Sequence, residues 1–300
     1  MTHLSKLKPA ETLYLMDVGV NLKTLLKNTF MDLVFKGVLN LEERSQEYMT
    51  RDKYNRKVSA KKTYRYVSAG KALDSYIPQT FEFVFLEPFK IAPDLKTLME
   101  SYVKIIAKST NSESSFKRKI LKSANLSSLV KANFLQRVFA IYSLSEKGKQ
   151  VKKEIANTLK TCEAKFPELV KSDPGKAVEL MMKIGGNIFL VENLDLSLLN
   201  KLDKNVVKAQ LVKIKDQAKN KGKHDYADND YFDEFDEFDD FLQFEMMLDV
   251  FEDTFNSFDS FESFDSFDSG FDSSFNDSFS DFSGDSGCSS CSGCGGCGGD

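Results

Sequence analysis

The chain has 300 residues, of which 41% are hydrophobic and 29% charged. This composition excludes collagen, a small disulfide-rich domain and a polytopic membrane protein. The formal net charge of −4 conceals an uneven distribution: all 41 Lys and Arg residues lie within 1–224, whereas 22 of the 45 Asp and Glu residues lie within 225–300. We therefore expect a basic body followed by an acidic tail.

The sequence indicates a cytoplasmic protein without a membrane span. It contains no run of 18 or more apolar residues, and its first twenty residues lack the uninterrupted apolar stretch of a secretory signal. Four of the five cysteines fall in the last thirteen residues, and only Cys162 lies in the body. A secreted protein of this size would have cysteines spread through its fold, so a reducing compartment fits better.

No motif in the sequence indicates catalysis. The two histidines, His3 and His224, lack the neighbours of a nucleophile system. Nucleotide-binding, zinc-protease and serine-hydrolase motifs are also missing. We expect a protein that is not an enzyme.

Residues 1–77 are predicted to form a winged-helix-like unit. Two helices are expected before Gly37, and Asn21 is a suitable N-cap for the second. Residues 38–43 and 61–70 have the pattern of strands on either side of a polar, basic excursion. Helix, helix, strand, basic loop and strand is the element order of a winged helix.

A second winged-helix-like unit is predicted over residues 78–160. Residues 81–89 suit a buried strand or a first helix, Pro93 opens a helix, and residues 137–145 suit a strand pair before a basic helix. Residues 161–224 have the pattern of a helical extension. The expected fold class is α+β, rich in helix, with tandem winged-helix-like units and a disordered acidic tail.

The tail, residues 225–300, is a low-complexity segment. It holds 15 of the 26 Phe residues, many of them in a degenerate Phe-Asp-Ser repeat, and it has few aliphatic residues. Such a segment lacks the aliphatic side chains of a core, so we expect it to be disordered.

Two stretches resemble known families. The sequence KPAETLYLMDVGVNLKTLLKNTFMDLVFKGVLNLEE and the terminal GCSSCSGCGGCGGD resemble an uncharacterised family of predicted bacterial membrane proteins with winged-helix-like units and Gly/Cys-rich tails. The resemblance covers about residues 7–160 and the last fifteen. It implies no catalytic residues, and membrane residence does not carry over because the spans are missing here. The same N-terminal pattern is also similar to the helical fold of the Golgi phosphoprotein 3 family.

The polar excursion is a candidate polyanion-binding site. Lys and Arg neutralise phosphates, and here they alternate with tyrosines on a predicted wing. The alternative is a solvated hairpin, and acidic lipid headgroups or acidic proteins are further possible partners. The helix before it offers only Lys23, Lys27 and Asn28 for reading bases, which is little for a recognition helix. The candidate nucleic-acid or polyanion ligands are Arg44, Arg51, Lys53, Arg56, Lys57, Lys61, Lys62 and Arg65.

A second candidate site is the terminal cysteine cluster. Cys288, Cys291, Cys294 and Cys297 recur at intervals of three, and four thiolates suffice for zinc or another soft metal. The surrounding Gly and Ser residues offer no second shell of supporting contacts, so reactive thiols without a dedicated metal are the alternative, and no other cofactor is expected.

These features predict an interaction or scaffold protein that docks a protein partner through its basic body. The alternative is a nucleic-acid-binding protein that its own acidic tail inhibits. The tail is tethered to a body of opposite charge, so it would act as an intramolecular competitor at low salt.

Overall fold

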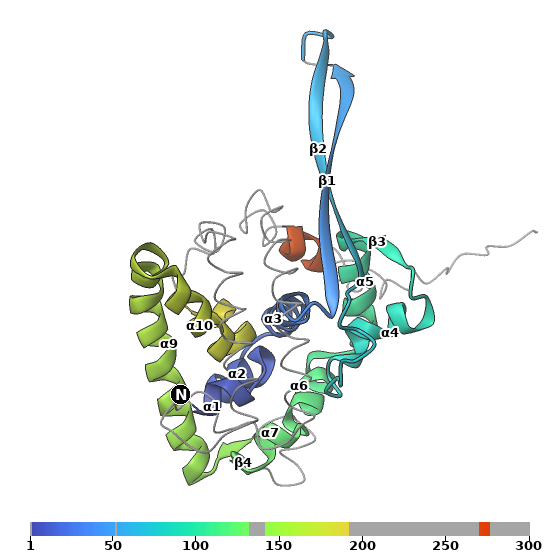
Figure 1. The fold of residues 1–300 in the computed structure, drawn as a ribbon. Helices are drawn as coiled ribbons and strands as arrows, with labels where there is room; N and C mark the ends of the chain where they lie inside the picture. The colour runs from blue at the N-terminus through green and yellow to red at the C-terminus, as the bar shows by residue number, and fades with distance from the viewer. Residues whose placement is uncertain (1, 52, 132–141, 192–269, 277–300) are drawn as a thin grey trace, which may run out of the picture.

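The computed structural model describes residues 2–51, 53–131, 142–191 and 270–276. It is rich in helix and carries a small antiparallel sheet, which confirms the predicted α+β class. A helical body surrounds one hydrophobic core, and a long β-hairpin projects from it (Figure 1). Among the described residues, no helix is long and apolar enough to cross a membrane.

The body begins with helices α1 (Thr2–Lys6), α2 (Pro9–Met16) and α3 (Leu22–Phe35). Asn21 is the N-cap of α3, as predicted, since Asn21 Oδ1 accepts a hydrogen bond of 2.8 Å from the amide of Thr24. Gly37 follows with φ of 60°, a conformation that glycine adopts without a Cβ clash. Local sequence features therefore define both ends of this helix.

Helix α3 lies at the centre of the body, and its residues are buried on nearly every side. Of the three polar side chains that the sequence offers on this helix for reading bases, Asn28 and Lys23 make contacts within the protein. Asn28 is buried and its side-chain amide donates to the carbonyl oxygen of Thr24, and Lys23 forms an ion pair with Asp272. These side chains are engaged within the protein.

The hairpin consists of β1 (Leu39–Arg51) and β2 (Lys57–Ala69). The two strands pair antiparallel over their whole length, from Leu39 opposite Ala69 to Arg51 opposite Lys57. The prediction of a long polar loop over residues 44–60 is wrong, since most of that segment continues the strands. A third strand, β3 (Lys96–Leu98), pairs with β2 only near the body.

The part of the chain predicted as a second unit is mainly helical. Residues 83–91 are helical rather than extended, and the helix expected from Pro93 begins after β3. Strands β4 and β5 are two residues each, and most of the predicted strand pair 137–145 lies outside the described residues. The elements are α4 (Phe83–Ile91), α5 (Met99–Ser109), α6 (Glu113–Leu121), α7 (Ala124–Ser127), β4 (Val130–Lys131) and β5 (Ser143–Leu144).

Three further elements close the body. The long helix α9 (Glu146–Ser172) packs on α1 and α2 and is followed by α10 (Pro174–Ile184) and the 3₁₀ helix η1 (Gly185–Leu190). Asp173 caps α10, since its side chain accepts a hydrogen bond from the amide of Lys176, and Gly185, with φ of 55°, follows the end of the helix. Residues 192–224 of the predicted extension lie outside the described residues.

One piece of the tail belongs to the described structure. Residues 270–276 form a short helix against α3, α5 and the base of the hairpin, drawn in orange-red in Figure 1. Phe271 and Phe275 are part of the hydrophobic core. For these seven residues the expectation of disorder is wrong, because the body supplies the apolar surface that the tail itself lacks.

Candidate functional site

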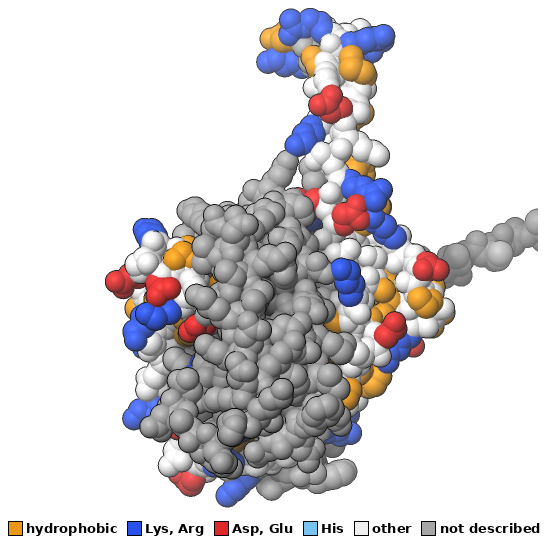
Figure 2. Space-filling model, in the orientation of Figure 1, with side chains coloured by type: hydrophobic (Ala, Val, Ile, Leu, Met, Phe, Trp, Pro, Cys, Tyr) orange, Lys and Arg blue, Asp and Glu red, His pale blue; other side chains and the backbone are white. Residues whose placement is uncertain are grey.

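The outer part of the hairpin is an exposed cationic surface. We call residues 47–51 and 53–62 the arm. The hairpin base is held in the core by Leu39, Leu41 and Val67, whereas nearly every residue of the arm is solvent-exposed. At about 3.4 Å per residue, strands of this length extend roughly 40 Å. Figure 2 shows Lys and Arg side chains gathered around the end of the arm.

The structure divides the eight predicted ligands into two groups. Arg44 and Arg65 lie at the base, where each contacts a carboxylate of β1. The other six residues lie on the arm. The continuous sequence 47–62 contains only two acids, Glu47 and Asp52, so this stretch of sequence has a net charge of +4. The arm residues are Arg51, Lys53, Arg56, Lys57, Lys61 and Lys62.

The two base arginines are held by local ion pairs. Arg44 Nε lies 2.5 Å from Glu42 Oε1, and Arg65 bonds to Glu43 across the two strands. Hydrogen bonds from Lys96 and Arg44 lower the pKa of Glu42. The hydrogen bond between Arg44 and Glu42 also raises the pKa of Arg44. Arg44 and Arg65 therefore contribute ion pairs that hold the base of the hairpin together.

The end of the arm combines cations with an aromatic ring. Tyr54 is 66% exposed, and the cationic groups of Lys53 and Arg56 lie 5.0 and 5.2 Å from its ring centre. Arg51 donates to the side-chain oxygen of Asn55 at 2.7 Å, and Asn55 has φ of 62° in the turn. An exposed ring between cations presents a stacking surface beside phosphate-binding groups.

A buried polar cluster is the main alternative site, and sequence reasoning missed it. Lys8 Nζ lies 2.6 Å from Glu82 Oε2 and 2.8 Å from the hydroxyl of Tyr76, which donates to Glu82 Oε1 at 2.9 Å. Burial lowers the pKa of Lys8, although the Glu82 carboxylate opposes this, and burial beside that carboxylate raises the pKa of Tyr76. Each of these groups has a protein partner, so the cluster ties α2 to residues 76–82.

A second buried acid, Asp32, lies on α3 itself. Asp32 Oδ2 lies 2.7 Å from Lys36 Nζ. Burial disfavours the charge on Lys36, but Asp32 and Glu82 outweigh it and raise the pKa of this lysine. Gly186 leaves room for Asp32, because a Cβ on this glycine would stand 2.1 Å from Asp32 Oδ1.

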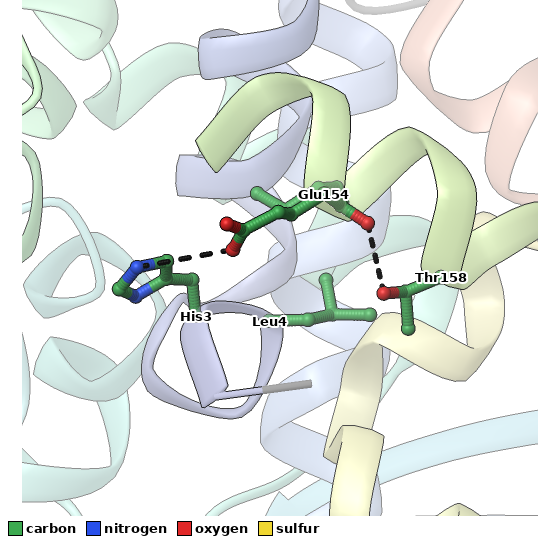
Figure 3. A pocket seen from close by; sticks show the side chains of 5 residues that line it. His3, Leu4, Glu154 and Thr158 are labelled. Carbon is green, nitrogen blue, oxygen red and sulfur yellow. Dashed lines mark hydrogen bonds and ion pairs between the residues drawn. The ribbon is translucent and has the colours of Figure 1, made fainter. Parts of the chain in front are cut away.

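A small hollow lies between α1 and α9 (Figure 3). His3 Nε2 stands 3.9 Å from Glu154 Oε2, and the hydroxyl of Thr158 donates to the backbone oxygen of Glu154. The hollow has a volume of about 10 Å³, which holds about one water molecule. It has no room for a substrate.

Of the five cysteines, only Cys162 lies within the described residues. Cys162 is buried in α9, and burial raises the pKa of its thiol, as expected for a packing residue. The predicted metal ligands Cys288, Cys291, Cys294 and Cys297 lie outside the described residues. Within the described part of the chain, no group of three His, Cys, Asp or Glu side chains is arranged for a metal ion.

No family model, curated protein or solved structure matches this chain.

Proposed function

We propose that this protein binds nucleic acid through the arm, as a non-catalytic protein of the cytoplasm. The observation that carries the proposal is the placement of six Lys and Arg residues on an exposed two-stranded ribbon. Neutralising backbone phosphates drives most of the affinity of such proteins. A two-stranded ribbon also has the dimensions to enter the major groove of a duplex.

The length of the hairpin supports nucleic-acid binding over the alternative of a solvated hairpin that only serves the fold. A hairpin that served only the fold would need no more than its base, where Leu39, Leu41 and Val67 are buried. The strands instead continue beyond the core with little apolar burial to stabilise them.

A protein-docking role is the second candidate. Tyr48 and Met49 are 48% and 66% exposed on the arm, and exposed apolar side chains are typical of protein interfaces. Under this candidate the scaffold function expected from the sequence would use the same arm, with an acidic protein as partner.

The test compares the full chain with a variant in which Arg51, Lys53, Arg56 and Lys57 are changed to Gln. Fluorescence anisotropy with a labelled 20-base-pair DNA and a labelled 20-nucleotide RNA is measured over a salt series. We expect the variant to bind at least about tenfold more weakly at 50 mM salt, with the slope of log K against log salt reduced by about 3.6 for the duplex.

The matched control replaces Lys108, Lys147, Lys153 and Lys160, four exposed helical lysines, with Gln. It removes the same charge and should bind almost as tightly as the parent chain. Equal loss in both variants would exclude the arm as a nucleic-acid site. In that case the protein-docking role would be favoured.

A further inference from the structure

The docked helix of residues 270–276 points to a peptide-binding site on the body. It is joined to the rest of the described chain only through a segment that begins after residue 191, yet three of its side chains are as buried as those of the core. Phe271 is 1% exposed, Ser274 3% and Phe275 8%. Seven residues far along the chain therefore fill a surface that the body presents.

The apolar part of this surface is an aromatic column. The ring centres of Phe271 and Phe30 are 6.1 Å apart, Phe30 and Tyr102 are 5.9 Å apart, and Tyr102 and Phe89 are 5.5 Å apart. Tyr102 is fixed in turn, because its hydroxyl donates to the backbone oxygen of Phe85 at 2.7 Å. Phe271 thus extends a stack whose other members come from α3, α4 and α5.

Polar contacts on two sides of the docked helix give the surface a preference for acidic segments. Asp272 Oδ2 lies 3.0 Å from Lys23 Nζ in the first turn of α3. At the other side, a Cβ on Gly270 would stand 3.1 Å from Arg65 Nη1 and 3.6 Å from the terminal methyl of Met99. An acidic segment fits between these cations, and a basic segment would be repelled.

From these contacts we propose that α3, α5 and the hairpin base form a recognition site for short acidic helices with Phe at positions i and i+4, and that residues 271–275 occupy it within the same chain. Two phenylalanines four apart share one helical face, with the acid of the second position beside it. The same pattern recurs at residues 251–255, FEDTF, so the tail carries more than one candidate ligand. This proposal does not depend on nucleic-acid binding.

The site is tested with a peptide of residues 268–278 that carries 4-fluorophenylalanine at position 275. The receptor is the full chain in which Phe251, Phe255, Phe271 and Phe275 are changed to Ala, so that neither motif can occupy the site. In ¹⁹F NMR the peptide resonance should broaden and shift on adding this chain. The unchanged chain should have at least about tenfold less effect, because its tethered ligand competes at an effective concentration of order millimolar.

Peptide variants then test each contact. Phe271→Ala should abolish the effect, since one of the two buried rings is lost. Ser274→Asp should also abolish it, because Ser274 is buried, whereas Ser273→Asp should bind like the parent peptide, because Ser273 is exposed. A receptor with Lys23→Glu should bind the parent peptide several-fold more weakly, and Asp272→Lys in the peptide should restore binding to it.

A loss of peptide binding can be distinguished from a loss of folding in the receptor. Circular dichroism of the receptor establishes that its helices are intact before the titration. If the folded receptor leaves the peptide resonance unchanged up to 2 mM peptide, or if the Phe271→Ala peptide gives the same effect as the parent, the site does not recognise this motif and the proposal is wrong.

Discussion

Gly70 approaches the carbonyl oxygen of Gly37 so closely that a Cβ on Gly70 would stand 2.0 Å from that oxygen. The contact lies where the hairpin leaves the body, and it is flanked by hydrogen bonds from Gly70 N to Val38 O and from Ala72 N to Gly37 O. Both sides of the contact are backbone, so neither can move aside as a flexible side chain would.

Gly70→Ala should therefore lower the free energy of unfolding by about 3 kcal/mol or more, measured by urea denaturation. Gly19→Ala is the matched control, because its nearest neighbour is a side-chain oxygen of Asp17 at 3.2 Å. The control should change stability by less than about 1 kcal/mol. If the Gly70→Ala chain were as stable as the control, the backbone at the hairpin base would have to shift at little cost, which would contradict the prediction.

The buried pair Lys8–Glu82 makes a second prediction. Lys8→Met leaves the fully buried carboxylate of Glu82 without its cation and should cost about 3–5 kcal/mol. Adding Glu82→Leu removes the stranded charge, so the double variant should regain part of that loss. The remainder reflects Tyr76 and the amide of Gln79, which lose their acceptor. Additive costs in the double-mutant cycle would contradict a direct coupling.

The buried tyrosines predict a loss of stability at high pH. Burial raises the pKa of Tyr14 to about 12 and also raises those of Tyr76, Tyr102 and Tyr142. A phenol whose pKa is higher in the folded state contributes stability that is complete below pH 10 and is lost as the pH rises toward the folded value. Helical circular dichroism should therefore fall together with the late phenol absorbance change at 295 nm.

Tyr14→Phe isolates one of these groups. The variant should lose one phenol from the absorbance change that accompanies unfolding near pH 12, whereas Tyr54→Phe provides a control in which an exposed phenol is removed. A late absorbance change of unaltered size in Tyr14→Phe would contradict the assignment.

The charge of the tail predicts competition with an external polyanion. Changing Asp259, Asp265, Asp268, Asp277 and Asp281 to Asn should tighten DNA binding several-fold at 50 mM salt and have little effect at 500 mM, where the charges are screened. Asp272 is retained so that its ion pair with Lys23 persists.

The control for this prediction makes the same change of charge elsewhere. Glu146, Glu154, Glu163, Glu168 and Glu179 of α9 and α10 are changed to Gln; these helices pack on the side of the body away from the hairpin (Figure 1). Equal tightening in both variants would mean that net charge alone, and not the tail, governs binding.

Features that depend on near neighbours in the chain were predictable from the sequence. Asn21, Gly37 and Asp173 each bond or turn within a few residues, so their roles follow from local rules. The length of the hairpin did not follow. A strand with no buried face has no apolar alternation, so residues 44–60 have the composition of a loop.

Contacts between distant segments were beyond sequence reasoning for a different reason. Lys8 and Glu82 are ordinary charged residues until the fold buries them together. Phe271 belongs to a segment too poor in aliphatic residues to form a core, but the aromatic column of the body supplies the missing partners. In both cases the decisive information is the identity of the neighbour across space.

The arm also has a property that follows from its two strands alone. Beyond β3, each described strand of the hairpin pairs only with the other, so both outer edges expose backbone donors and acceptors that could accept a strand from another molecule. Lys and Arg side chains on such edges prevent that association by mutual repulsion. The strand cations of the arm thus also help to keep the protein soluble, and a chain in which Arg51, Lys57, Lys61 and Lys62 are replaced by Gln is expected to associate edge to edge.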